Sequence, residues 1–245
     1  MFLPNKSIKQ FNHQHQSCGD TFTLLCWNVA KMTLSHSYKE YFKLLIESEN
    51  VDILLLQEVK KQLQNELNIH GYSYVLSPNI QTKNHIFGVL SAFKISCEKN
   101  LALLTQKKEF SYMTHKVSLI TEHKTLNADK LIIVNLHAIN FVKNSDFYHE
   151  LDSIKSILIS HKGAMIVAGD FNTWNSKRIL FLREFTNSLA LKAVTFGDDT
   201  HLKKVFSNSL DYIFYRGLRL IDSKVINSRK ISDHNPIMAR FELIS

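Results

Sequence analysis

Residues 164–174, AMIVAGDFNTW, carry the strongest structural signal in the chain. Five apolar residues lead to Gly169, and the polar residues Asp170 and Asn172 follow within three positions. A short apolar run bounded by glycine and polar residues is typical of a buried β-strand. An Asx turn alone would also explain Asp-x-Asn after a glycine, so this segment gains a functional meaning only from the rest of the chain.

Other apolar runs also end in a polar side chain. FTLLCW is followed by Asn28, ILLLQ by Glu58 and LIIVNL by His137, and later apolar runs are preceded by Asp211 and by the pair Asp233 and His234. Groups at the ends of rigid strands are held in fixed positions, as a catalytic or binding site requires. We therefore expect these side chains to gather at one edge of the core.

Four of the gathered groups are carboxylates, namely Glu58, Asp170, Asp211 and Asp233. Carboxylates that lie close together repel one another unless a cation or a proton intervenes. Oxygen ligands without a thiolate suit Mg²⁺, for which Mn²⁺ is a possible substitute. The pattern predicts a divalent-metal site.

The composition favours a single folded domain. The 245 residues include only 7 Gly and 3 Pro, which leaves little material for flexible linkers. We expect a polar, loosely ordered leader over residues 1–21 and one domain over residues 22–245. Three cysteines without C-x-x-C spacing indicate a reducing compartment, and no apolar run is long enough to span a bilayer. We expect a cytoplasmic monomer.

The net charge favours a polyanionic partner. Lys and Arg number 30 against 22 Asp and Glu, which gives a formal charge of +8. Nucleic acid and acidic lipid headgroups are partners of this kind. The basic residues are scattered in short pairs, however, so a solvated surface explains them as well.

Periodicity indicates a mixed α and β fold with a β-rich core. Short apolar runs outnumber the segments with helical spacing, which cover residues 38–48, 147–160 and 176–187. No repeat of fixed period is present, which disfavours propellers and solenoids.

The ordered motifs together resemble the endonuclease/exonuclease/phosphatase superfamily, which includes DNase I and exonuclease III. The motifs are WN (27–28), LQE (56–58), NLH (135–137), GDFN (169–172), LDY (210–212) and SDHNP (232–236). The stretches NLHAINF, AGDFNTWNSKR, LDYIFYRGL and ISDHNPIMARFE are similar to the bacterial YafD-like subgroup. The resemblance, over about residues 22–243, implies an α+β fold: a four-layer αββα sandwich of two packed, mainly antiparallel mixed sheets flanked by helices.

The resemblance also implies roles around a metal. Glu58 would be the main metal ligand, with Asn28 beside it and Asp233 as a possible partner. Asp170 and Asn172 would orient the attacking water and the phosphate. We assign the general base to His234, with Asp170 as the alternative.

Further roles concern the groups around these residues. Asp211 would hold His234 in one tautomer. His137 would donate a proton or contact phosphate, and Asn140 would contact phosphate. Lys60 matches a lysine of exonuclease III-like sequences, and Arg216 could bind a phosphate through two hydrogen bonds or lie as rim charge.

The function predicted from these features is a Mg²⁺-dependent phosphodiesterase, with nucleic acid as the favoured substrate. A lipid or small-molecule phosphodiester hydrolase is the alternative, although no long exposed apolar hairpin for membrane docking is evident in the sequence. A non-catalytic binding protein is a third hypothesis, which the full set of acidic and histidine positions disfavours.

Overall fold

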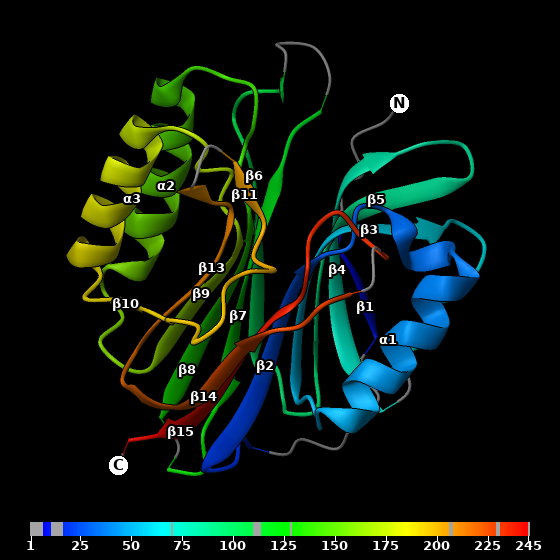
Figure 1. The fold of residues 1–245 in the computed structure, drawn as a ribbon, viewed down its shortest axis with the longest axis horizontal. Helices are drawn as coiled ribbons and strands as arrows, with labels where there is room; N and C mark the ends of the chain where they lie inside the picture. The colour runs from blue at the N-terminus through cyan, green and yellow to red at the C-terminus, as the bar shows by residue number, and fades with distance from the viewer. Residues whose placement is uncertain are drawn as a thin grey trace.

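The computed structural model describes residues 7–10, 17–69, 71–109, 114–127, 129–205, 208–228 and 231–244. Two β-sheets pack face to face, and helices cover their outer faces (Figure 1). The predicted α+β sandwich of four layers is therefore confirmed.

The first sheet has seven strands in the order β1-β4-β5-β3-β2-β15-β14. These strands are β1 (Ile8–Gln10), β2 (Thr21–Asn28), β3 (Ile53–Gln62), β4 (Ser73–Gln81), β5 (His85–Phe93), β14 (Leu218–Val225) and β15 (Ile237–Leu243). β1 lies within the segment that we expected to be a loose leader, yet it pairs antiparallel with β4. Residues 1–6 and 11–16 of that segment lie outside the described residues.

The second sheet has six strands in the order β10-β13-β9-β8-β7-β6. These strands are β6 (Lys99–Leu104), β7 (Val117–Lys124), β8 (Lys130–His137), β9 (Met165–Asp170), β10 (Lys192–Ala193) and β13 (Asp211–Arg216). A small separate ladder joins β11 (Lys204–Val205) to β12 (Asn208–Ser209).

The helices lie where the spacing predicts them. α1 (His36–Ser48) covers the first sheet, and α2 (Asn144–Leu158) and α3 (Ser176–Ser188) cover the second (Figure 1). A short 3-10 turn, η1 (Met32–Leu34), precedes α1, which Ser35 caps by accepting the amide hydrogen of Tyr38. Within the described ranges, no helix combines the length and the apolar character that crossing a membrane requires.

Successive side chains of a strand point to opposite faces of the sheet, and this alternation divides the core into layers. On β2, Leu24 and Cys26 face the cluster between the two sheets, whereas Leu25 and Trp27 face the cluster under α1. β9 behaves in the same way and sends one set of side chains between the sheets and the other beneath α2 and α3. Both faces of the central strands are buried, which explains why they read as continuous apolar runs.

The topology brings the functional strand ends to one edge. β2 pairs parallel with β3, and β8 pairs parallel with β9, so within each pair the carboxyl ends lie side by side. In the second sheet, His137 on β8 is in register with Asp170 on β9, and Asp170 is in register with Asp211 on β13. Three polar side chains therefore stand in a row on neighbouring strands.

A glycine is required immediately before Asp170. Gly169 has φ +148°, and a Cβ at this position would overlap the backbone of Leu136 on β8. Any side chain would push β9 away from β8 just where His137 and Asp170 stand in register.

We predict that Gly169→Ala lowers the free energy of unfolding by about 3 kcal/mol or more, because it adds backbone strain and a clash in a close-packed sheet. Urea unfolding of both proteins measures this difference. Gly197→Ala is the matched control, since a Cβ there would meet no atom within 4 Å. Equal losses in the two variants would contradict the steric argument.

Candidate active site

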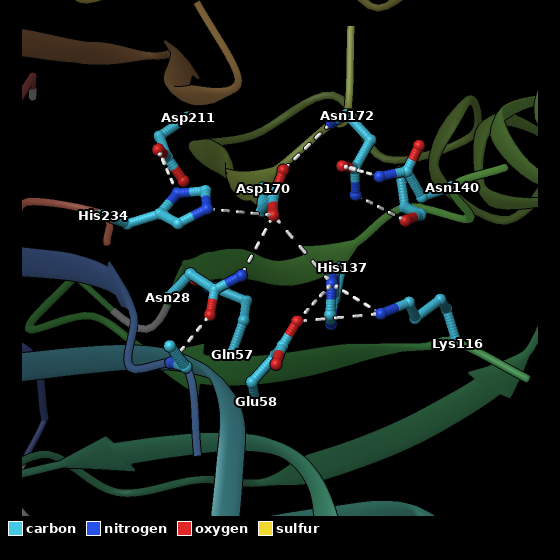
Figure 2. Close-up of polar contacts among 12 residues, drawn as sticks. Asn28, Gln57, Glu58, Lys116, His137, Asn140, Asp170, Asn172, Asp211 and His234 are labelled. Atoms are coloured by element: carbon cyan, nitrogen blue, oxygen red, sulfur yellow. Dashed lines mark hydrogen bonds and ion pairs between the residues drawn. The ribbon is translucent and has the colours of Figure 1, made fainter. Parts of the chain in front are cut away.

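A histidine and two aspartates form the centre of the site. His234 lies just before β15, and its Nδ1 is 2.7 Å from Oδ2 of Asp211. Its Nε2 is 3.9 Å from Oδ2 of Asp170 (Figure 2). All three side chains are buried, so their charges are weakly screened and interact strongly.

The surroundings raise the pKa values of His234 and Asp170. Burial lowers the pKa of His234, but the charge of Asp211 and the hydrogen bond to it outweigh burial and raise the pKa to about 9. Burial, and then repulsion by Asp211, raise the pKa of Asp170 to about 6. At neutral pH His234 is therefore an imidazolium, and Asp170 is mainly a carboxylate.

Asn28, at the end of β2, connects this centre to the first sheet. Its Nδ2 donates to Oδ2 of Asp170 at 3.0 Å, and its Oδ1 accepts the amide hydrogen of Ala30 at 3.0 Å. The backbone carbonyl of Asn28 accepts a hydrogen bond from the Ser232 hydroxyl at 2.8 Å. The amide oxygen of Asn28 is thus directed away from Asp170.

A β-bulge aims Glu58 into the site. The pairing of β3 with β5 shifts register between Leu56 and Val59, and Glu58 adopts φ 55°. Successive residues of a regular strand point to opposite faces, but a bulge with left-handed backbone allows two in a row to face the same side. Gln57 and Glu58 both contact β8, through Asn135 and His137 respectively.

Two lysines flank Glu58. Nζ of Lys31 is 3.5 Å from its Oε2, and Nζ of Lys116 is 3.8 Å from its Oε1. Lys116 also donates to Nε2 of His137 at 3.0 Å (Figure 2). Its Nζ lies 3.6 Å from Oε2 of Glu109. Burial, together with the charge of Lys116, holds the pKa of His137 well below its usual value, so this imidazole is neutral.

Two asparagines close the other side of the site. Nδ2 of Asn140 donates to Oδ1 of Asn172 at 2.8 Å, and the Asn172 backbone amide donates to Oδ1 of Asp170 at 3.0 Å. Asn172 has φ 50°, which is the left-handed region that asparagine tolerates better than most residues. Its Nδ2 is held by the carbonyl of Ala138 at 2.9 Å.

Buried polar contacts support the site from below. Nε2 of Gln57 donates to Oδ1 of Asn135 at 2.7 Å, which links the first sheet to the second. Nε1 of Trp27 donates to the carbonyl of His234 at 2.8 Å. Trp27 is therefore a packing residue beneath the site.

Three predicted site residues do not join this cluster. The side chain of Asp233 is 63% exposed and pairs with Lys203 at 3.0 Å. Arg216 lies at the far end of β13, where it donates to the carbonyls of His161, Gly163 and Leu189. Nζ of Lys60 lies 6.0 Å from the ring centre of Phe87.

These differences have a simple geometric cause. Asp233 adjoins His234 in sequence, but the short turn directs the two side chains differently. β13 is antiparallel to β9, so Asp211 meets the carboxyl end of β9 while Arg216 meets Met165 at its beginning. Asp233 and Arg216 thus have other partners in this arrangement, and the roles of Asp233 as a metal ligand and of Arg216 and Lys60 in substrate binding stay predictions.

Sequence reasoning missed Lys116, Lys31 and Glu109. Lys116 directly precedes the apolar run of β7, and because β7 is antiparallel to β8 its beginning lies beside the end of β8. A pattern based on the carboxyl ends of strands does not find a residue at the beginning of a neighbouring strand. Lys31 lies in the loop after β2, and nothing in its local sequence distinguishes it from other surface lysines.

The remaining donor set fits a hard divalent cation. Among the described residues, the contacts of the Glu58 carboxylate are ion pairs of 3.5 Å or longer. The amide oxygen of Asn28 accepts the amide hydrogen of Ala30, and Oδ1 of Asp211 is buried without a hydrogen-bond partner in the described part of the chain. One ligand atom each of Asp170, Asp211 and His234 lies within 4.8 Å of the others. Carboxylate and amide oxygens of this kind are ligands that Mg²⁺ and Mn²⁺ accept.

Comparison with known proteins identifies the family of this chain. The model of the Endonuclease/Exonuclease/phosphatase family matches residues 25–234. A UPF0294 protein of Erwinia tasmaniensis is 32% identical over 232 residues, which cover 92% of this chain and 82% of that protein.

Solved structures share the fold. An endonuclease/exonuclease/phosphatase family protein from Leptotrichia buccalis superposes with a TM-score of 0.68 at 19% identity, over 91% of this chain and 100% of that one. The human nocturnin catalytic domain superposes with a TM-score of 0.69 at 17% identity, over 94% and 97% of the two chains. The chain therefore belongs to the endonuclease/exonuclease/phosphatase family of phosphoester hydrolases, and its relatives are the UPF0294, or YafD-like, proteins.

Proposed function

We propose that this protein is a divalent-metal-dependent phosphodiesterase that acts on nucleic acid. The observation that carries the proposal is the cluster of His234, Asp170 and Asp211, which Asn28 contacts directly and Glu58 reaches through His137. Phosphodiester hydrolysis requires neutralised phosphoryl oxygens, an activated water and a stabilised leaving oxygen. The five residues, with their lysine neighbours, provide groups for each requirement.

Glu58 and the amide oxygen of Asn28 would hold Mg²⁺ or Mn²⁺. The bound ion would act as a Lewis acid toward the phosphate. Asn28 at the same time donates to Asp170, so the ion site and the carboxylate are positioned by one side chain.

Asp170 is the proposed general base. It is the carboxylate whose pKa of about 6 places it near neutrality, and it faces the site between Asn28 and His234. A base works best when its pKa is close to the operating pH. The sequence favours His234 for this role, with Asp170 as the alternative. The raised pKa of His234 keeps its imidazole protonated at neutral pH and therefore favours Asp170 as the base.

His234 would instead act as a cation. Asp211 holds its Nδ1, which leaves the Nε2–H free to donate to a phosphoryl oxygen. Asn172 and Asn140 provide neutral donors on the adjacent side of the site. Lys116, which the neutral imidazole of His137 orients, is the proposed stabiliser of the leaving oxygen.

Nucleic acid is the proposed substrate because of the net charge of +8 and because the fold serves nucleases. The endonuclease domain of a telomere-specific retrotransposon superposes with a TM-score of 0.63. A 2′,3′-cyclic phosphatase superposes with a TM-score of 0.67, so small phosphoesters are the alternative substrates. The cytoplasmic location and the monomeric state stay predictions.

The first test is cleavage of labelled DNA and RNA with Mg²⁺, with Mn²⁺ and with EDTA. We expect cleavage that EDTA abolishes, and a loss of about 100-fold or more in kcat/KM for Glu58→Gln. Glu184→Gln on the exposed face of α3 is the matched control. Metal-independent cleavage, or equal activity of the two variants, would contradict the proposal, and cleavage of small phosphoesters alone would favour the alternative.

The second test is the pH dependence of kcat/KM. With His234 as the cation, activity falls as pH rises through about 9, because the imidazolium loses its proton. With His234 as the base, activity would instead rise through the same pH. A steady-state profile between pH 6 and 10 at saturating metal distinguishes the two assignments.

The third test concerns Lys116. We expect Lys116→Met to reduce kcat by about 100-fold for an oligonucleotide, whose leaving oxygen is a poor leaving group. The loss should be small for a p-nitrophenyl phosphodiester, because its p-nitrophenolate leaving group is stable without stabilisation by Lys116. Lys107→Met is the control, because Lys107 is exposed and lies in the connection between β6 and β7. Equal losses on both substrates would contradict the role of Lys116 in stabilising the leaving oxygen.

A further inference from the structure

Arg178 is a buried cation that the proposed chemistry does not use. It lies in the first turn of α3 and is 0% exposed. Its guanidinium lies between two aromatic rings, 4.6 Å from the centre of Phe147 and 5.2 Å from that of Trp174. A buried cation is costly unless its surroundings compensate it, so the position requires an explanation.

The guanidinium hydrogen bonds join two loops of the site. Nη1 donates to the carbonyl of Ile139 at 2.9 Å and to that of Asn172 at 3.0 Å. Nη2 donates to the carbonyl of Val142 at 3.4 Å. Ile139 and Val142 belong to the loop after β8, and Asn172 belongs to the loop after β9. One planar group therefore fixes the separation of the two loops.

These loops carry the two asparagines of the site. Asn140 lies next to Ile139, and its Nδ2 donates to Oδ1 of Asn172 at 2.8 Å. Trp174, which stacks on Arg178, also donates from Nε1 to Oδ1 of Asn140 at 2.9 Å. Arg178 thus reaches Asn140 by two routes, through the backbone of Ile139 and through the ring of Trp174.

Two acidic side chains hold the same loop from the other side. Oε2 of Glu150 accepts the amide hydrogen of Ile139, and Oε1 of Glu109 accepts that of Asn140, each at 2.8 Å. Burial lowers the pKa of Arg178 to about 10 while the charges of Glu150 and Glu109 oppose the shift, so the group stays cationic at neutral pH. Burial raises the pKa of Glu150 to about 8, so at neutral pH this carboxyl is largely protonated and holds the loop through its hydrogen bond to the Ile139 amide.

We propose that Arg178 is a positioning residue that holds Asn140 and Asn172 at the spacing needed to bind the phosphate. This inference rests on the proposed function, and it adds a residue that does not itself touch the substrate. A misplacement of about 1 Å in a positioning group can reduce a rate by about 100-fold. Lysine cannot replace arginine here, because a single ammonium can neither reach three carbonyls nor stack as a plane.

The test compares Arg178→Lys and Arg178→Ala with Arg183→Ala, an exposed arginine of the same helix. For variants that circular dichroism shows to be folded, we expect kcat on an oligonucleotide to fall about 100-fold for both Arg178 variants, with KM changed less than about 5-fold. Arg183→Ala should stay within 2-fold of wild type, on the order expected for an exposed side chain. Ethylguanidinium should restore part of the kcat of Arg178→Ala, and ethylammonium should not.

A merely structural role predicts a different result. Folded Arg178→Lys would then keep the wild-type kcat, and ethylguanidinium would raise only the melting temperature of Arg178→Ala; either result overturns the proposal. If the wild-type protein cleaves no phosphodiester, the proposed function fails, and the crystal structure of Arg178→Lys decides the positioning role separately. Retention of the 2.8 Å contact between Asn140 and Asn172 would overturn it, and loss of that contact would support it.

Discussion

Charge repulsion between Asp170 and Asp211 is the constraint on which the rest of the site depends. The two carboxylates are buried on adjacent antiparallel strands and in direct register. Burial of two like charges is unfavourable unless other groups compensate them. His234 lies against both, and Asn28 donates to Asp170, so the histidine and the asparagine are structural requirements of this pair as well as candidates for chemistry. Burial, and then this repulsion, raise the pKa of Asp170, and the repulsion makes a bound cation favourable nearby.

The backbone is strained where the site is assembled. Glu58 and Asn172 have positive φ angles, and Gly169 stands where no side chain fits. Such conformations persist only where the surrounding structure enforces them. Here the sheet pairings on either side of the bulge enforce Glu58, and hydrogen bonds from Asn172 to Asp170 and Ala138 enforce the loop after β9. The strained backbone at Glu58 is therefore held by strand pairing, and that at Asn172 is held by hydrogen bonds.

The sequence predicted the strand ends well because burial on both faces leaves a clear apolar run that stops at the polar residue. This rule located Asn28, His137 and Asp170 at the ends of β2, β8 and β9, whereas Glu58 lies inside β3 at the bulge. The ordered motifs indicated the sandwich. The rule gives no signal for Lys116 or for the position of Arg216, because both depend on which neighbouring strand runs antiparallel. Adjacency to His234 does not fix the direction of the Asp233 side chain, which pairs with Lys203. The contacts of Arg178 involve the loops after β8 and β9 and the rings of Phe147 and Trp174, which no local sequence pattern brings together.

The hydrogen bond between Gln57 and Asn135 has a consequence for the whole molecule. The first sheet contributes Asn28, Glu58 and, just before β15, His234, whereas the second contributes His137, Asp170 and Asp211. Apolar layers alone can slide over one another at little energetic penalty, but Asn135 on β8 accepts a hydrogen bond from Gln57 on β3 and donates one to the carbonyl of Leu90 on β5 in the buried interior. Displacement of one layer by a single residue would break these hydrogen bonds between the sheets. The hydrogen bond between Gln57 and Asn135 therefore helps to keep the site residues of the two sheets aligned.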